Sequence, residues 1–92
     1  DMNAFTRNLF STVALCIVSF SAIAAPECTQ EPKEKWLSES DMKAKIVSEG
    51  YTIKRFLTSG SCYEIYGKNK QGKNVEIYFN PVDGKIVKQR AG

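Results

Sequence analysis

The order of apolar and polar residues after residue 36 predicts one helix followed by four strands. Ser38 suits a helix N-cap, and Asp41 stands at the third helical position, where an acidic side chain completes a capping box. Gly50 suits the left-handed residue that commonly follows a helix. We therefore expect a helix over residues 39–49. Its expected apolar stripe consists of Met42, Ala44, Ile46 and Val47.

Four runs with strand character follow the helix: residues 51–57, 62–68, 73–80 and 85–90. Glycine-containing turns separate these runs, which favours an antiparallel meander. In the first run, Ile53 and Phe56 are three positions apart, so they share a face only if a bulge or a strong twist lies near Arg55. The inward-facing set of this strand stays open.

A three-residue hairpin loop with Gly72 in the left-handed position would set the register of the two middle strands. Counting back from this loop gives four pairs: Ile65 with Ile77, Tyr63 with Phe79, Tyr66 with Glu76, and Glu64 with Tyr78. A slip of one residue would mix the apolar and polar faces, so the pattern supports this register. The residues expected to cover the helix are Tyr63, Ile65, Val75, Ile77, Phe79 and Ile86. The predicted fold class is therefore α+β, with one helix packed on a four-stranded antiparallel meander.

Residues 1–24 have the features of a secretory signal peptide. Arg7 supplies a positive charge, residues 9–20 form an apolar core, and Ala22-Ile23-Ala24 has the small-x-small pattern of a cleavage site. Asp1 precedes the first methionine and is expected to be non-native. Cleavage after Ala24 would deliver the chain to the periplasm or the exterior.

An uncleaved membrane anchor is the alternative, because residues 9–25 are just long enough to span a bilayer. In either case, residues 25–35 read as an extended polar arm, since they contain two prolines and no periodic pattern. Residues 36–92 form the predicted folded domain.

The cysteines point to a disulfide bond. Cys16 would leave with the leader, so that Cys28 and Cys62 remain as an isolated pair in an oxidising compartment. A reactive or metal-binding thiol pair is the alternative. Redox cysteines usually stand two residues apart, and no third or fourth zinc ligand accompanies this pair.

Charge and composition narrow the chemistry. The chain has 13 basic and 10 acidic residues, an excess too mild for the dense basic stripe of a nucleic-acid binder. It has no histidine, the usual general base and the commonest metal ligand. Glu64 and Glu76 share a predicted face and could form an acid–base pair, but an outward face of alternating tyrosine and glutamate explains them as well. We expect no enzyme, no metal site and no cofactor.

Several segments resemble the PepSY domain family, and in particular its small, single-domain periplasmic members. The segments are Gly50-Tyr51, Cys62-Tyr63-Glu64-Ile65-Tyr66, Lys70-Gln71-Gly72-Lys73, Val75-Glu76-Ile77-Tyr78, and residues 80–87 (Asn-Pro-Val-Asp-Gly-Lys-Ile-Val). The resemblance spans residues 36–90. Such members typically carry one cysteine in the arm and one at the start of the second strand, which Cys28 and Cys62 match. Many have aspartate where this chain has Asn80, which also suits the turn.

The resemblance implies a role rather than a reaction. The family is named for its occurrence in peptidase propeptides, where an inhibitory or chaperone-like role is inferred, and it has no agreed catalytic residues. We therefore expect a non-enzymatic periplasmic module that binds an unknown protein of the cell envelope, such as a peptidase, and no nucleic acid. The alternative is a structural or assembly subunit of a membrane complex, held by an uncleaved leader; only then would the chain contact a membrane.

Two surfaces are candidates for the partner. The first is the predicted outer face, consisting of Glu64, Tyr66, Glu76 and Tyr78, because exposed aromatic residues on a rigid sheet are good anchors. The alternative is that the arm folds across this face. The second is the last strand, with Lys85, Val87, Lys88 and Arg90, to which an extended segment could add as a further strand. Its charges also suit protection of the edge against such pairing.

Overall fold

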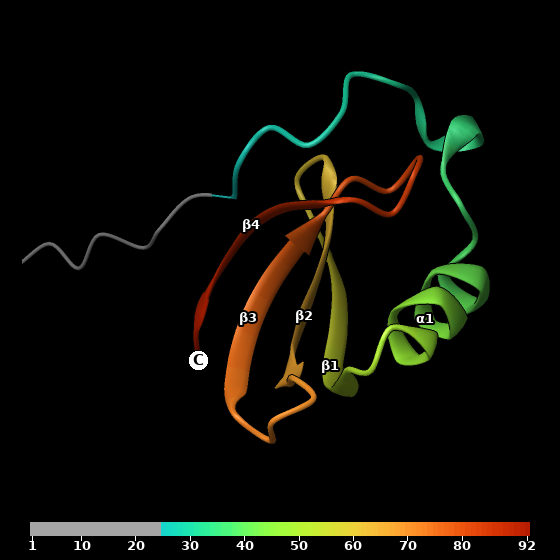
Figure 1. Cartoon of the computed structure of the whole chain (residues 1–92). Coiled ribbons are helices and arrows are strands. Elements are labelled where there is room, and N and C mark those ends of the chain that lie inside the picture. The colour runs from blue at the N-terminus through green and yellow to red at the C-terminus, as the bar shows by residue number, and fades with distance from the viewer. Residues whose placement is uncertain (1–24) are drawn as a thin grey trace, which may run out of the picture.

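A computed structural model describes residues 25–92, so the predicted leader and Cys16 lie outside the described residues. The elements in chain order are the 3₁₀ turn η2 (Lys33–Lys35), α1 (Glu39–Ser48), β1 (Thr52–Ser59), β2 (Cys62–Lys68), β3 (Asn74–Phe79) and β4 (Ile86–Ala91). The strands form one sheet in the order β1-β2-β3-β4, and all neighbours are antiparallel. The predicted α+β meander is confirmed (Figure 1).

The caps of α1 agree with the sequence pattern. The Ser38 hydroxyl accepts a hydrogen bond of 3.1 Å from the Asp41 N–H. At the other end, Gly50 has φ of 102°, and the Tyr51 N–H reaches back to the Ile46 carbonyl at 3.4 Å. These bonds satisfy backbone groups that a bare helix end would leave unpaired. The helix therefore ends within one residue of the predicted position.

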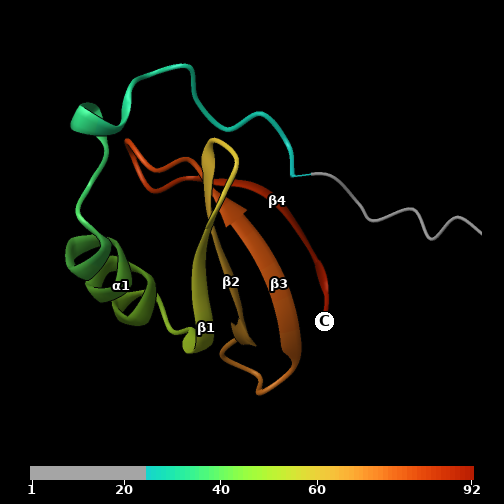
Figure 2. The same cartoon turned by 180° about the vertical axis from the view of Figure 1, so that it is seen from behind.

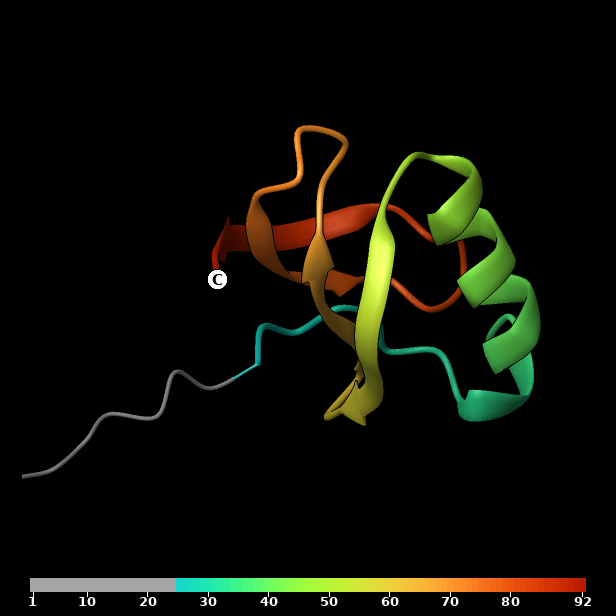
Figure 3. The same ribbon diagram turned by 90° about the horizontal axis from the view of Figure 1, so that it is seen from below.

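The sheet is wider than the single helix that covers it. Figures 1 and 2 show α1 beside β1, whereas β4 runs along the opposite side of the sheet. Figure 3 shows the same neighbourhood of α1 and β1 from below. One helix covers only part of a four-stranded sheet, so three residues that were predicted to be buried are exposed.

The predicted core was wrong at three residues, which are exposed: Ala44, Val47 and Ile86. On α1, only Met42 and Ile46 are buried, while Val47 is 57% exposed and Ala44 is also exposed. Val47 lies one turn after Lys43, whose ammonium sits over the Phe56 ring of β1, so this side of the helix faces the border of the sheet. Ile86 is 39% exposed because β4 lies beyond the reach of the helix.

The predicted register of β2 and β3 is confirmed at all four pairs. The loop between them closes through Asn69, whose side-chain oxygen accepts the N–H groups of Gln71 and Lys73 at 3.0 Å each. Gly72 takes φ of 78°, as expected for the left-handed loop position. The turn before β4 closes similarly, because the Asn80 side chain accepts the Val82 N–H at 2.8 Å.

The register of β1 settles which of its residues face inward. A shift between Ile53 and Arg55 confirms the predicted irregularity near Arg55. Ile53, Phe56 and Thr58 oppose the inward-facing residues of β2. The main core then consists of Met42, Ile46, Tyr63, Ile65, Val75, Ile77 and Phe79, with Trp36, Leu37, Tyr51, Ile53 and Phe56 packed around it.

Cys28 and Cys62 form the predicted disulfide bond, with an S–S distance of 2.01 Å. The bond joins the arm (residues 25–35) to the first residue of β2. In Figures 1 and 2 the arm passes the end of the sheet where β2 begins and β3 ends, and then continues to α1. Within residues 25–92, no helix is both long enough and apolar enough to cross a membrane.

Removal of the disulfide should lower the free energy of unfolding by about 3.5 to 4 kcal/mol, because it frees a loop whose ends are 34 positions apart. The test is urea denaturation of the Cys28→Ser/Cys62→Ser variant against the oxidised protein, followed by Trp36 fluorescence. A loss below about 1 kcal/mol would show that the bond does not constrain the unfolded chain as the chain-entropy model requires.

Gly67 should be the glycine of the sheet that tolerates substitution least. A Cβ at Gly67 would overlap the backbone carbonyl oxygen of Thr52 in β1, where the strands approach closely beside the bulge. We expect Gly67→Ala to cost about 3 kcal/mol through steric overlap. Gly72→Ala is the control, because its Cβ would meet no atom within 4 Å and only the positive φ is unfavourable, at about 1 kcal/mol. Equal losses in urea denaturation would contradict the close approach.

Candidate functional site

The four outer-face residues come together as the register predicted. We call the sheet surface opposite α1 that carries Glu64, Tyr66, Glu76 and Tyr78 the outer face. Glu64 is 3% exposed, Glu76 is 4% exposed and Tyr78 is equally buried, whereas Tyr66 is 37% exposed. Of the four residues, only Tyr66 is presented to solvent.

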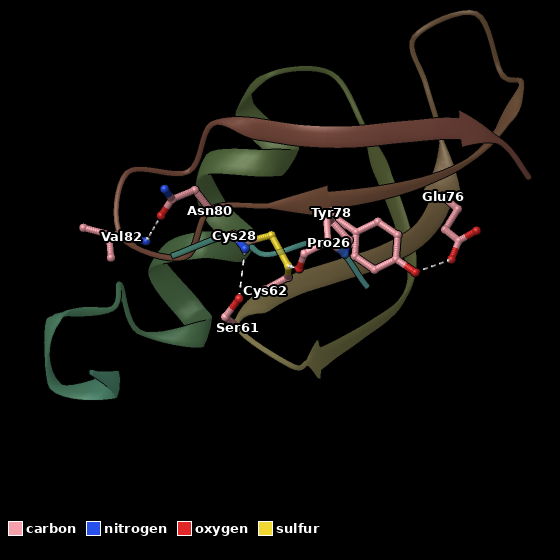
Figure 4. The surroundings of a disulfide bond; sticks show 8 residues. All are labelled: Pro26, Cys28, Ser61, Cys62, Glu76, Tyr78, Asn80 and Val82. Carbon is pink, nitrogen blue, oxygen red and sulfur yellow. Dashed lines mark hydrogen bonds between the residues drawn. A yellow bond between two sulfur atoms is a disulfide. The ribbon is translucent and has the colours of Figure 1, made fainter. Parts of the chain in front are cut away.

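The arm covers the part of the outer face around Tyr78. Cys28, Cys62 and Tyr78 form a buried cluster of their own, and Ala25 packs against it. The Cys28 N–H donates a hydrogen bond of 2.9 Å to the Ser61 hydroxyl. Figure 4 shows the Tyr78 side chain extending from the neighbourhood of the disulfide toward Glu76. The arm therefore lies across one half of the face that the sequence proposed for a partner.

The arm also contacts the disulfide through its backbone. The Pro26 carbonyl oxygen lies 3.1 Å from the Cys62 sulfur. A disulfide sulfur carries no proton, so this is a close polar contact and not a hydrogen bond. Together with the Cys28 to Ser61 hydrogen bond, it holds the arm against the start of β2 next to the covalent link.

Glu76 is the ionised member of the carboxyl pair. It accepts hydrogen bonds from the Arg90 Nε at 2.6 Å and from the Tyr78 hydroxyl at 3.1 Å. The hydrogen bond with the Glu64 carboxyl, followed by those from Arg90 and Tyr78, lowers the pKa of Glu76 to about 2. Burial, followed by the bond to Glu76, raises the pKa of Tyr78 to about 12, so this phenol stays a donor at neutral pH.

Glu64 is the member of the pair whose pKa is raised. Burial, followed by its hydrogen bond to Glu76, raises the pKa of the Glu64 carboxyl. Its Oε2 atom is buried and has no hydrogen-bond partner. Protonation of Glu64 would turn its carboxyl into a donor toward Glu76 and would remove a buried charge. The two carboxyls are therefore coupled, and Glu64 binds a proton more readily than Glu76 does.

The chemistry open to this pair is limited by what surrounds it. Two carboxyls with separated pKa values are an arrangement found in acid–base catalysts. Here, however, both are buried, and Glu76 is engaged by Arg90 and Tyr78. The cavity beside Tyr66, of about 160 Å³, is lined by Gly67 and Tyr66 among others, but by neither glutamate. Within the part of the chain that the structure describes, no three His, Cys, Asp or Glu residues cluster as a metal site would need.

The second candidate surface, β4, lies at one border of the sheet, and all its residues are exposed. Val87 and Lys88 belong to the strand, while Lys85 lies just before it. The Arg90 side chain is not free for a partner, because it forms an ion pair with Glu76. The sequence pattern missed this pair because the register of β4 is irregular between Tyr78 and Phe79, so counting from the turn does not lead to it. The sequence-based prediction considered only the last strand as a border of the sheet. It left out β1, although the predicted strand order makes β1 the other border.

The sequence matches the model of the family described as "Peptidase propeptide and YPEB domain" over residues 8–90. The match spans nearly the whole chain and agrees with the family that the turn and core motifs resemble. No curated protein sequence and no solved structure matches the chain.

The opposite pKa shifts of Glu64 and Glu76 predict opposite effects of pH on stability. The lowered pKa of Glu76 contributes stability that is present above its ordinary value near 4.5 and is lost as pH falls toward 2. The raised pKa of Glu64 contributes stability that is present below 4.5 and is lost as pH rises through the raised value. We therefore expect Glu76→Gln to lower the free energy of unfolding at pH 7 by about 2 to 3 kcal/mol.

Glu64→Gln is the matched control, because it keeps the shape of a protonated glutamate. It should leave stability at pH 7 unchanged or higher and should flatten the loss above pH 4.5. Urea denaturation across pH measures both effects. If Glu64→Gln destabilises the protein at pH 7 as much as Glu76→Gln does, the raised pKa of Glu64 is contradicted.

Proposed function

Because the chain belongs to the PepSY family of peptidase propeptide and YPEB domains, we propose that it is a non-enzymatic periplasmic module that binds and restrains a peptidase or another protein of the cell envelope. Family membership suggests a propeptide-like, peptidase-regulatory module. The observation that carries the proposal is the extent of the match: it spans residues 8–90 and so includes the folded part from residue 36 to residue 90.

The disulfide supports the periplasmic part of the proposal. A Cys28–Cys62 bond persists in an oxidising compartment and is uncommon in the cytosol. In this proposal, residues 1–24 act as a cleaved signal peptide, and the mature chain begins with the arm. Ala25 would then be the new N-terminus, close to the point where the disulfide fastens the arm to β2.

The accessible part of the outer face is the proposed contact surface. Tyr66 is its exposed aromatic residue, and the Arg55 guanidinium lies 5.6 Å from the centre of the Tyr66 ring. Tyrosine and arginine are enriched among residues that dominate binding energy at protein interfaces. The residues beneath this surface are buried, and Tyr78 donates a hydrogen bond to Glu76. They stabilise the sheet under Tyr66 and do not contact the partner themselves: Glu64, Glu76 and Tyr78.

The buried state of the carboxyl pair supports a non-enzymatic role. A general acid or base must come within hydrogen-bond reach of its substrate. Glu64 and Glu76 are covered, and their donors and acceptors are directed at each other and at Tyr78 and Arg90. Their arrangement suits a structural link between β2, β3 and β4 better than an open reaction site.

Tyr66→Ala should weaken capture of the envelope partner at least tenfold, because it removes the exposed aromatic anchor while leaving the core intact. The measurement is affinity capture from envelope extract on immobilised, disulfide-bonded protein, with mass spectrometry of what is retained and a peptidase assay of the eluate. Tyr78→Ala is unsuitable as a probe, since Tyr78 is buried and its loss would open a cavity.

Gln71→Ala is the matched control, because Gln71 is exposed at the hairpin loop away from Tyr66. It should retain the same proteins as the wild type. Equal retention by Tyr66→Ala would rule out this surface, and the absence of any specifically retained envelope protein would count against the proposed function.

A further inference from the structure

A cavity lies beside Tyr66, at the end of the sheet that carries the β2–β3 hairpin. Its volume is about 160 Å³. The lining residues come from β1, β2 and β3 and from the residue that follows β4: Lys54, Tyr66, Gly67, Asn74, Val75 and Gly92. Figures 1 and 2 show the arm at the opposite end of the sheet, and no residue of the arm lines the cavity. The arm therefore covers the outer face around Tyr78 and leaves this cavity uncovered.

The size and the lining of the cavity suit one aromatic ring. Cavities of about 150 Å³ with apolar walls accept benzene. The walls of this cavity are mostly apolar, and Tyr66 contributes an aromatic residue to them. Pairs of aromatic rings attract each other beyond the apolar area that they bury. Tyr66 therefore favours an aromatic occupant over an aliphatic one.

The charge around the cavity is positive. Lys54 lines the cavity. The Arg55 guanidinium lies 5.6 Å from the centre of the Tyr66 ring. Lys68 is the β-sheet partner of Asn74, which also lines the cavity. Within residues 25–92, none of these three cations belongs to an ion pair, so carboxylates of an occupant would meet cations that have no acidic partner.

The two carboxyls of the outer face do not offset this positive charge. Glu64 and Glu76 are 3% and 4% exposed, and Glu76 is already paired with Arg90. A second copy of this chain that presented the same surface would bring like charges together, which is unfavourable at an interface. An acidic segment of another protein would meet opposite charge instead.

We propose that the cavity beside Tyr66 is a binding site for an aromatic side chain of a partner protein, presented by an acidic segment. The ring enters the cavity, and carboxylates of neighbouring residues in the segment lie near Lys54, Arg55 and Lys68. The inference rests on the proposed function, because it names the kind of segment through which a bound envelope protein contacts the surface around Tyr66.

The test uses a short synthetic peptide that has glutamates on both sides of a central phenylalanine and is blocked at both ends. Titrated into ¹⁵N-labelled, disulfide-bonded protein, it should shift the amide resonances of the lining residues 54, 66, 67, 74 and 75 and leave those of α1 in place. The same peptide with glycine in place of phenylalanine should bind at least tenfold more weakly, because it leaves the cavity empty.

Lys54→Glu and Lys85→Glu form a matched pair of variants, because both lysines are exposed and both substitutions change the net charge equally. Lys54 lines the cavity, whereas Lys85 lies in the turn before β4, at the other end of the sheet. Lys54→Glu should weaken binding of the parent peptide at least tenfold, and Lys85→Glu should leave the affinity nearly unchanged. Thermal unfolding of both variants checks that neither has lost its fold.

Four results would overturn the proposal: no binding of the parent peptide, equal binding of the glycine peptide, equal effects of the two variants, or tighter binding to vesicles of anionic phospholipid than to the peptide. The last result would assign the positive surface to a membrane. The peptide assay needs no envelope extract, so it can fail while capture through Tyr66 succeeds, and it can succeed while that capture fails. The two proposals are therefore tested separately.

Discussion

The covalent link between Cys28 and Cys62 is the constraint on which the outer face depends. It holds an arm without regular strand structure against the beginning of β2, and the arm in turn buries Tyr78. Tyr78 donates to Glu76, which is paired with Arg90 on β4. A chain of contacts thus runs from the arm across the sheet to its far border, and its first link, the burial of Tyr78, needs the arm to stay in place.

A single helix against four strands leaves the two borders of the sheet in different situations. β1 has α1 beside it, whereas no helix of residues 25–92 lies beside β4. The inner face is apolar where the helix lies and becomes exposed toward β4, which explains why Ile86 is not a core residue. In a domain this small, the disulfide supplies constraint that a larger core would otherwise provide.

The sequence specified the fold well because its strongest signals are local. Ser38, Gly50 and Gly72 mark the helix ends and the hairpin loop through backbone requirements that few other residues meet, and the register of β2 and β3 follows from the loop by counting. Burial was less predictable. Val47 has the spacing of a core residue, but its exposure depends on where α1 lies over the sheet, which no local pattern encodes. The pairing of Arg90 with Glu76 required the register of β4, which is irregular.

Whether the disulfide-held arm closes half of the outer face is tested most directly by tyrosine-specific labelling of the oxidised protein, with the labelled positions identified by mass spectrometry. Tyr66 should be modified readily, and Tyr78 should be protected until the disulfide is reduced. Modification of Tyr78 at the same rate as Tyr66 while the Cys28–Cys62 bond is intact would contradict the account, because the arm would then leave the face open.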